Sequence, residues 1–333
     1  MIVFFMFQGF ADPARLIVGQ TGDKKTMDNI RRELYLDQPK WKQFVFYLND
    51  VSPIGYHSAQ EIKEKKLRGF FIGGEKPDSY RVGLKIPYLR RSYQTKKDVV
   101  DVLMEALPGT IMLAFAAMIF ATIIGVLLGV LAAVKQNTWM DTSSVFASVI
   151  GISAPSFFMA IVIAYLFGIV LHPYTGLNLT GSWFDIDETT GQRYLTLQNL
   201  ILPAITLGIR PLAIITQLTR SSLLDVLNQD YIRTAYAKGL SKRTVVFKHA
   251  LRNALNPVIT AITGWFAELL AGAFFVEYIF GWKGIGKVTV DALDKLDYPV
   301  VMGSVLFSAA FFILINILAD ILYGVVDPRV RLQ

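Results

Sequence analysis

The 333-residue chain contains no cysteine and only three histidines, His57, His172 and His249, which lie far apart in the sequence. Without cysteine the chain forms no disulfide and no cysteine-ligated zinc or iron–sulfur site. The scattered histidines suggest no metal cluster, and no nucleophile and base occur at a recognisable spacing. The sequence therefore offers no candidate catalytic residues.

Charged residues are also scarce. They make up 18% of the chain, whereas 53% is hydrophobic. A soluble enzyme of this length is seldom so apolar, so we expect an integral membrane protein. The net charge of +7 is compatible with nucleic-acid binding, but in a membrane protein the distribution of Lys and Arg is more informative than their sum.

Five apolar runs are long enough to cross a membrane, which needs roughly 20 residues. They cover residues 110–134, 143–171, 197–219, 258–280 and 300–323. Residues 1–10 are apolar but too short, and we interpret them as the outer half of a first transmembrane helix whose start lies upstream. The expected fold is thus an all-α membrane protein with about six transmembrane helices.

Two features inside these runs predict local geometry. Gly125, Gly129 and Ala133 recur at every fourth position, so a neighbouring helix is expected to pack closely there. Pro155, in the sequence Ser-Ala-Pro-Ser, is expected to kink the second run.

Residues 11–107 are polar, with mixed charges and many turn-forming residues. We expect a folded α+β segment outside the membrane, with a helix over 28–36 and a second short helix over 97–107 that leads into the first complete span. Residues 108–333 are the expected transmembrane domain.

A basic island at 220–257 separates two apolar runs and carries seven basic against two acidic side chains. This island, the short turn at 135–142 and the C-terminal tail fall on one side of the membrane. By the positive-inside rule that side is cytoplasmic. The long segment 11–107 falls outside although it is also basic, because the rule holds for short loops.

The island has its own helical pattern. Tyr231, Thr234, Ala235 and Lys238 have the spacing of one helical face, and Gly239 is a good helix stop. Ser241 is expected to cap a second helix, whose apolar stripe is Phe247, Leu251 and Leu255. Two interpretations of the island are open: a solvated loop whose charges face water, and a docking element for a partner.

Residues 281–288 nearly match a phosphate-binding loop, but Val288 stands where the magnesium-binding hydroxyl should be. The segment also follows an apolar span and falls on the outer face, away from cytoplasmic ATP. We therefore interpret it as a turn at the membrane interface.

Charged residues within the spans are costly and usually face a partner or a wet cavity. Arg210 and Glu268 lie near the middle of two successive runs, and with Pro155 they are the candidate translocation pathway. Whether Arg210 and Glu268 pair with each other or line that pathway is open. Glu277 and Asp320 lie near span ends, where an interfacial position is expected.

The island resembles the cytoplasmic EAA loop of ABC-importer permeases, in the form found in the dipeptide/oligopeptide group. The pattern D-Y-x-R-T-A-x-A-K-G-L-S stands at 230–241, and H-A-L-R-N-A-x-x-P stands at 249–257. Similar stretches occur at 12–15, 36–39, 107–108, 153–157, 218–224, 276–277, 280–282, 297–300 and 320–331.

This resemblance implies a type I ABC importer permease in a bacterial inner membrane, with the island and the C-terminus in the cytoplasm. Its implied partners are a second homologous permease, two ATPase subunits and an external binding protein. The chain itself would be no enzyme and bind no cofactor, because ATP and magnesium would bind to the ATPase subunits. The implied ATPase-coupling residues are Asp230, Tyr231, Arg233, Thr234, Ala235, Lys238, Gly239, Leu240, Ser241, Arg243, His249, Arg252 and Asn253, with 233–241 for docking and 243–256 as the connection back to the membrane.

Three departures from the family pattern are the short first helix, an apparent insertion at 55–82, and Glu268 where a small residue is expected. Permeases of this group carry dipeptides, longer peptides, nickel chelates, glutathione or sugars, so peptides are one of several possible substrates. Two other classes stay open from the sequence. One is a stand-alone channel or secondary transporter, and the other is a membrane-tethered DNA-binding protein that uses the island as a helix-turn-helix.

Overall fold

The computed structural model describes residues 31, 35–74, 76, 79–186, 193–271 and 273–326. The expected partial span at 1–10, most of the helix at 28–36 and the tail beyond 326 lie outside these residues. The described chain is mostly helical with two small sheets, which confirms the expected membrane fold with a small α+β segment. It divides into two compact units, Met1–Glu105 with Asp291–Leu306 (unit 1) and Ala106–Val290 with Phe307–Gln333 (unit 2).

Unit 1 contains the small sheet. Its elements are α4 (Lys40–Val51), β1 (Ile54–Ser58), α5 (Ala59–Glu64), β2 (Gly69–Gly73) and β3 (Tyr80–Lys85). The strands are antiparallel in the order β1-β3-β2, with Ile54 opposite Leu84 and Phe70 opposite Leu84 on the other side. The apparent insertion at 55–82 therefore coincides with this sheet and α5. Segment Asp291–Leu306, which the sequence assigned to a loop and a span, belongs to this unit as well.

That segment joins unit 1 through Asp297. The Asp297 carboxylate, 3% exposed, accepts hydrogen bonds from the Ser92 hydroxyl (2.5 Å) and the Tyr93 amide (2.9 Å). A buried carboxylate with several donors is strongly held in place. The Asp297-Tyr298-Pro299 stretch thus has a structural role in the described chain.

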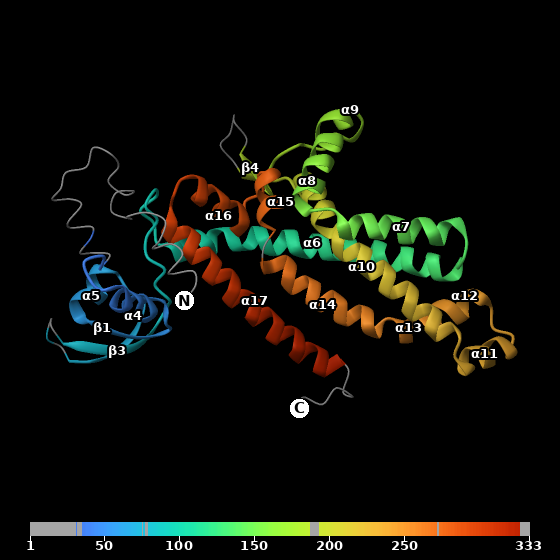
Figure 1. Ribbon diagram of the computed structural model, residues 1–333, viewed down its shortest axis with the longest axis horizontal. Coiled ribbons are helices and arrows are strands. Elements are labelled where there is room, and N and C mark those ends of the chain that lie inside the picture. Colours follow the sequence, from blue (N-terminus) through green and yellow to red (C-terminus); the bar gives the residue numbers. More distant parts are fainter. Residues whose placement is uncertain are drawn as a thin grey trace. The chain divides into compact units, whose positions relative to one another are not determined.

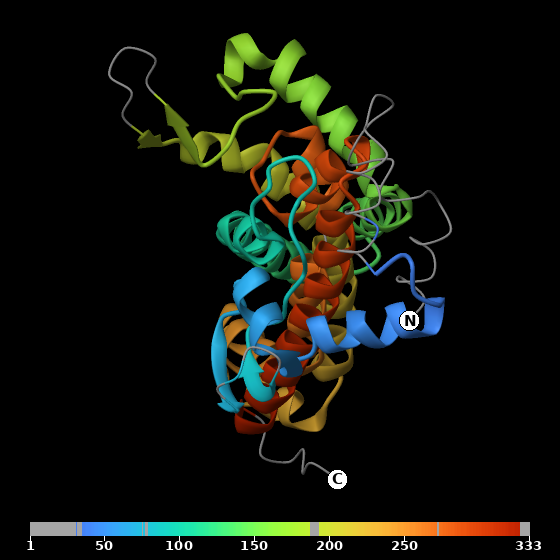
Figure 2. The same ribbon diagram turned by 90° about the vertical axis from the view of Figure 1, so that its left-hand side faces the viewer.

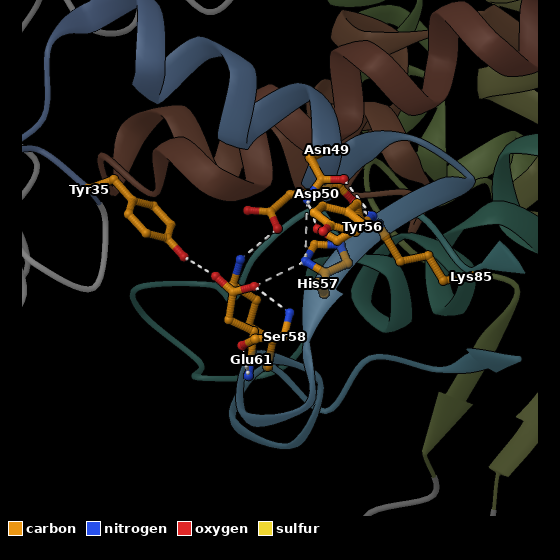
Figure 3. Close-up of polar contacts among 9 residues, drawn as sticks. Tyr35, Asn49, Asp50, Tyr56, His57, Ser58, Glu61 and Lys85 are labelled. Atoms are coloured by element: carbon orange, nitrogen blue, oxygen red, sulfur yellow. Dashed lines mark hydrogen bonds and ion pairs between the residues drawn. The ribbon is translucent and has the colours of Figure 1, made fainter. Parts of the chain in front are cut away.

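Polar side chains cluster between α4, β1 and α5 (Figure 3). Ser58 and Glu61 form a capping box at the start of α5, because each accepts a hydrogen bond from the other's backbone amide. The Glu61 carboxylate also accepts from the Tyr35 hydroxyl (2.8 Å) and lies 3.6 Å from the buried His57 imidazole. Beside it, the Lys65 ammonium binds the buried Asp50 carboxylate at 2.6 Å.

We expect this cluster to make unit 1 sensitive to acid. His57, and then the Tyr35 hydroxyl, lower the pKa of Glu61 to about 2 from its ordinary 4.5. A lowered pKa means that the ionised carboxylate stabilises the fold above pH 4.5, and that this stability is lost as the pH falls towards 2. Thermal unfolding of the purified full chain between pH 5 and pH 2.5, compared with Glu61→Gln, measures the contribution. The gap between the two proteins should narrow as the pH falls; a constant gap would contradict the assignment.

Unit 2 is built of long helices (Figure 1). The described helices and strands in and next to it are α6 (Val99–Val134), α7 (Trp139–Ser153), α8 (Ser156–Tyr165), the π-helix η1 (Leu166–Val170), α9 (His172–Thr175), β4 (Phe184–Ile186), β5 (Arg193–Leu195), the 3-10 helix η2 (Leu197–Leu200), α10 (Ile201–Leu227), α14 (Asn256–Ala271), α15 (Phe274–Ile279), α16 (Ile285–Asp294) and α17 (Tyr298–Val326). Strands β4 and β5 pair as a short antiparallel hairpin that extends away from the helices of unit 2 (Figure 2).

The predicted spans correspond to helices in three places. Val99–Val134, Leu197–Leu227 and Tyr298–Leu318 are long and apolar enough to cross a membrane, among the residues that the structure describes. The helix expected at 97–107 is not separate, because α6 continues through Pro108 into the first complete span.

The other two predicted spans differ from single helices. Helices α7 and α8 meet at a bend of 110°, much sharper than the expected kink, because Ala154 and Pro155 are both extended. As a pair they still have the length and composition of one span. The predicted span over 258–280 contains two helices, because α14 ends at Ala271 and α15 begins at Phe274.

Close approach of α6 and α10 confirms the expectation from the small residues. A Cβ atom on Gly125 would lie 3.0 Å from the Leu212 carbonyl oxygen, and one on Gly129 would lie 2.7 Å from that of Thr216. A distance of 2.7 Å is essentially never seen for a real Cβ atom, and 3.0 Å is shorter than most real Cβ contacts. The two helices therefore pack through their backbones along this stripe.

Candidate functional site

The island folds into short helices around a glycine turn. After α10 come α11 (Asp230–Ala237), α12 (Lys242–Thr244), the π-helix η3 (Val245–Ala250) and α13 (Leu251–Ala254). Gly239 has φ +80°, a left-handed conformation that favours glycine, and no described atom lies within 4 Å of the position of a Cβ atom there. Ser241 caps α12 as predicted, since its hydroxyl accepts the Thr244 amide at 3.3 Å.

An apolar cluster anchors the island to α6 and α10. Its buried members are Val130, Ala133, Leu223, Ile232, Ala235, Val245, Val246, Ala250 and Ala254. The cluster joins α11 and η3 to the ends of the two helices that pack through their backbones. The island is therefore continuous in packing with the helix pair, not a loop attached only by its two ends.

The predicted apolar stripe of the second helix is confirmed at Leu251 and Leu255, which pack against buried clusters, but not at Phe247. Phe247 is 51% exposed, and the inward-facing residues are Val245, Val246 and Ala250. The reason is the π-helix η3, in which the repeat is wider than in an α-helix and the side chains rotate relative to the expected face. The sequence pattern assumed a continuous α-helix.

The exposed side of the island combines charge and apolar surface. Of the thirteen expected coupling residues, Ala235 is buried, His249 is half-buried and the others are exposed. Arg233 is 76% exposed and lies 3.6 Å from Asp230, at the loose end of ion-pair distances. Exposed large apolar side chains accompany the basic ones: Tyr231, Tyr236, Leu240 and Phe247. The Tyr231 hydroxyl accepts a hydrogen bond from the Asn253 amide group at 2.8 Å, which ties α11 to α13.

An ion pair between the half-buried Arg220 and the buried Asp141, which the sequence did not reveal, stabilises the neighbouring turn. Asp141, at the start of α7, is 4% exposed and accepts two hydrogen bonds from the Arg220 guanidinium, at 2.5 and 2.8 Å. The same carboxylate accepts the Asn137 amide at 3.0 Å. Such a two-bond geometry fixes both side chains. It links the turn at 135–138 to the part of α10 where the island begins.

The candidate pathway residues lie at one cavity of about 100 Å³ in unit 2. Arg210 and Glu268 both line it, and Pro155 stands between two of its lining residues, Ala154 and Ser156. The structure thus brings together the three residues chosen from the sequence. No ion pair joins Arg210 and Glu268 in the described part of the chain; the guanidinium instead lies 5.6 Å from the centre of the Trp265 ring.

Glu277, which the sequence places near a span end, is fully buried within the protein. Its carboxylate accepts hydrogen bonds from the Thr110 hydroxyl (2.8 Å) and from the amides of Gly286 (2.7 Å) and Lys287 (3.2 Å). The segment that resembles a phosphate loop therefore directs two of its amides at a carboxyl group of the chain itself. Trp282 is also buried, and its indole N–H donates to the Gly109 carbonyl at 2.9 Å.

Two family models match the chain. The model described as binding-protein-dependent transport system inner membrane component matches residues 125–332, and its N-terminal companion matches residues 1–114. The chain belongs to this family. It is a permease of the dipeptide/oligopeptide type, as the island pattern predicted. Membership in a transporter family favours the transport interpretation of the island over the DNA-binding one.

Curated relatives of the chain support the same family assignment. The dipeptide transport system permease protein DppB of Alkalihalophilus pseudofirmus is 34% identical, over 96% of this chain and 90% of its own. DppB of Haemophilus influenzae is 43% identical, over 72% of this chain and 76% of its own. The glutathione transport system permease protein GsiC of Escherichia coli K12 is 34% identical, over 99% and 92%.

The fold of the permease is similar to that in an inward-facing structure of the MetNI methionine ABC transporter. The TM-score is 0.52, the identity is 18%, and the match covers 68% of this chain and 97% of the other. At this identity the likeness concerns the fold alone. It supports the type I importer permease fold that the resemblance implied.

Proposed function

We propose that this permease imports small peptides across the bacterial inner membrane by alternating access, driven by ATP hydrolysis on partner subunits. Small peptides are supported by the named substrates of its relatives, which include dipeptides and glutathione. The permease would receive its substrate from an external binding protein, as the name of its family indicates. Unit 1 would lie outside, and the island and C-terminus in the cytoplasm.

The complete importer would contain a second permease and two ATPase subunits, which bind the ATP and magnesium. In this arrangement the permease catalyses no reaction itself. The island, residues 220–257, is the coupling element: closure of the ATPases on ATP displaces α11 and α12, and the connected helices move as rigid bodies.

The proposal rests on one observation: the outer side chains of the island are exposed, while its inner side chains are packed against the rest of unit 2. The outer side of α11 and α12 presents Arg233, Lys238 and exposed aromatic side chains, while Ile232 and Ala235 are packed against α6 and α10. Arg and aromatic residues are enriched in protein interfaces. A partner bound to this side would act directly on α10, which contributes Thr206, Leu207, Ile209, Arg210 and Pro211 to the cavity lining of unit 2.

The charge reversal Arg233→Glu tests the coupling role. Arg233 is exposed and makes one loose ion pair, so the fold should be unaffected, whereas attachment of the ATPases should weaken by about tenfold or more. Co-purification of the ATPase subunits with the permease, and ATP-driven peptide uptake into proteoliposomes, measure both effects.

The matched control is Lys63→Glu, the same charge change on an exposed side chain of α5 in unit 1. This control should leave co-purification unchanged. An Arg233→Glu complex that assembles and transports like the wild type would argue that the charge is only solvated. A permease that transports peptide with no ATPase subunit present would favour the channel or secondary-transporter alternative.

A further inference from the structure

The cavity beside α10 has an unusual lining for a membrane-spanning region. It lies among the α7–α8 bend, α10 and α14, and its polar lining includes Ser156, Thr206, Arg210, Trp265 and Glu268. A cationic and an anionic side chain therefore border one space of about 100 Å³. Ionisable residues at such depth are costly and mark substrate or ion pathways more often than packing.

The two charges do not neutralise each other. Among the described residues, neither Arg210 nor Glu268 has an ion-pair partner within 4.0 Å, and both side chains are exposed. Packing of α10 on α14 places them together, while the cation–π contact with Trp265 holds the guanidinium. Each charge is thus available to a group that enters the cavity.

Besides Arg210, a second feature of the cavity lining favours an anion. The bend at Ala154 and Pro155 places the start of α8 at the cavity, where Ala154 and Ser156 are lining residues. No described side chain caps this helix start, so its first amides have no partner from a capping residue. Free amides and the positive end of the helix dipole attract carboxylates.

The cavity also contains groups that favour a cation. Glu268 supplies a carboxylate. In α10, Pro211 has no N–H to donate to the carbonyl of Leu207, which also lines the cavity. The cavity thus offers opposite electrostatic environments to the two ends of a dipolar molecule.

We propose that this cavity binds the zwitterionic main chain of a small peptide, with the peptide carboxylate at Arg210 and the start of α8, and the peptide ammonium at Glu268. The assignment rests on the proposed function and names the groups that recognise its substrate. Peptides of two or three residues carry these charges about 7 to 10 Å apart when extended. A peptide satisfies both charges at once, whereas a sugar or an uncharged solute satisfies neither.

Direct binding to the purified permease–ATPase complex, without the binding protein, tests the assignment by isothermal titration calorimetry. The probes are Ala-Phe, N-acetyl-Ala-Phe, which lacks the ammonium, and Ala-Phe amide, which lacks the carboxylate. For the wild-type complex each blocked peptide should bind at least about tenfold more weakly than Ala-Phe, because each loses one charge-assisted contact.

The variants should show a crossed pattern. In Glu268→Gln the penalty for N-acetylation should disappear while the penalty for the amide remains, and in Arg210→Gln the reverse should hold. Glu268→Asp and Arg210→Lys keep the charges and should retain much of the discrimination between the three peptides. Such a result would show that the effects of the Gln variants do not come from loss of folding. Equal weakening of all three probes in both variants would assign the residues a packing role, and would overturn the proposal.

Two further outcomes bear on the cavity assignment. Absence of Ala-Phe binding to the wild-type complex at millimolar concentration would overturn the cavity assignment, and so would unchanged discrimination in the variants, as expected if these charges pair with the second permease. Neither outcome contradicts the proposed function. That function is tested separately, by ATP-driven uptake of Ala-Phe by the wild-type complex supplied with its binding protein.

Discussion

Replacing Gly239 with proline is expected to lower ATP-driven uptake by roughly tenfold to a hundredfold while leaving the permease in the membrane and assembled. Proline holds φ near −65°, whereas Gly239 has φ +80°. Forcing this turn into another conformation costs on the order of 1 to 3 kcal/mol and changes the angle between α11 and α12. Uptake into proteoliposomes, with ATPase activity measured in parallel, would show ATP hydrolysis that no longer drives transport.

The matched control is Gly239→Asn, because asparagine tolerates the left-handed conformation better than other residues with a side chain. No described atom lies within 4 Å of the Cβ position, so the added side chain meets no obstacle within the chain. Most of the uptake should therefore survive. Equal loss in both variants would point to a tight fit against the ATPase; normal uptake by the proline variant would contradict the coupling role.

Replacing Glu277 with alanine is expected to destabilise the permease by about 3 kcal/mol or more, the largest stability effect that we expect for a single side chain. Three donors would lose their acceptor: the buried Thr110 hydroxyl and Gly286 amide, and the partly buried Lys287 amide. Each unsatisfied buried donor costs about 1 to 3 kcal/mol. The thermal unfolding midpoint of the purified complex measures the loss.

Two variants serve as comparisons for Glu277→Ala. Glu277→Gln keeps one acceptor oxygen and should cost less than alanine. Glu105→Ala removes a carboxylate that is 69% exposed and makes only a 3.6 Å ion pair with Lys97, so it should change stability by less than about 0.5 kcal/mol. If Glu277→Ala unfolds at the wild-type temperature, the loop at 284–287 is held by other contacts.

The sequence predicted best where a feature depends on local pattern. Gly239 and Ser241 were identified because a left-handed turn and a helix cap each require particular residues. The stripe of Gly125 and Gly129 was identified because backbone approach excludes larger side chains. The family resemblance then supplied the fold and the function, which no composition argument provides.

Features that depend on tertiary contacts were missed. Asp141 and Arg220 are 79 positions apart, and neither has a neighbour in sequence that predicts their ion pair. Glu277 was placed at an interface because it lies near the end of an apolar run, but donors from Thr110 and from the following loop make burial possible. Helix η3 was not predicted, because its wider repeat leaves no signature in a pattern of apolar residues.

The anchoring of the island has a quantitative consequence for the cavity. The part of α10 from Arg210 to Leu227 is about 25 Å long at 1.5 Å per residue. A tilt of about 5° applied at the Leu227 end displaces Arg210 by about 2 Å if the helix stays straight. Hydrogen bonds to a carboxylate do not survive such a displacement, because they weaken beyond a donor–acceptor separation of about 3.2 Å. A small rotation at the cytoplasmic end is thus sufficient to change the cavity from binding a peptide to releasing it.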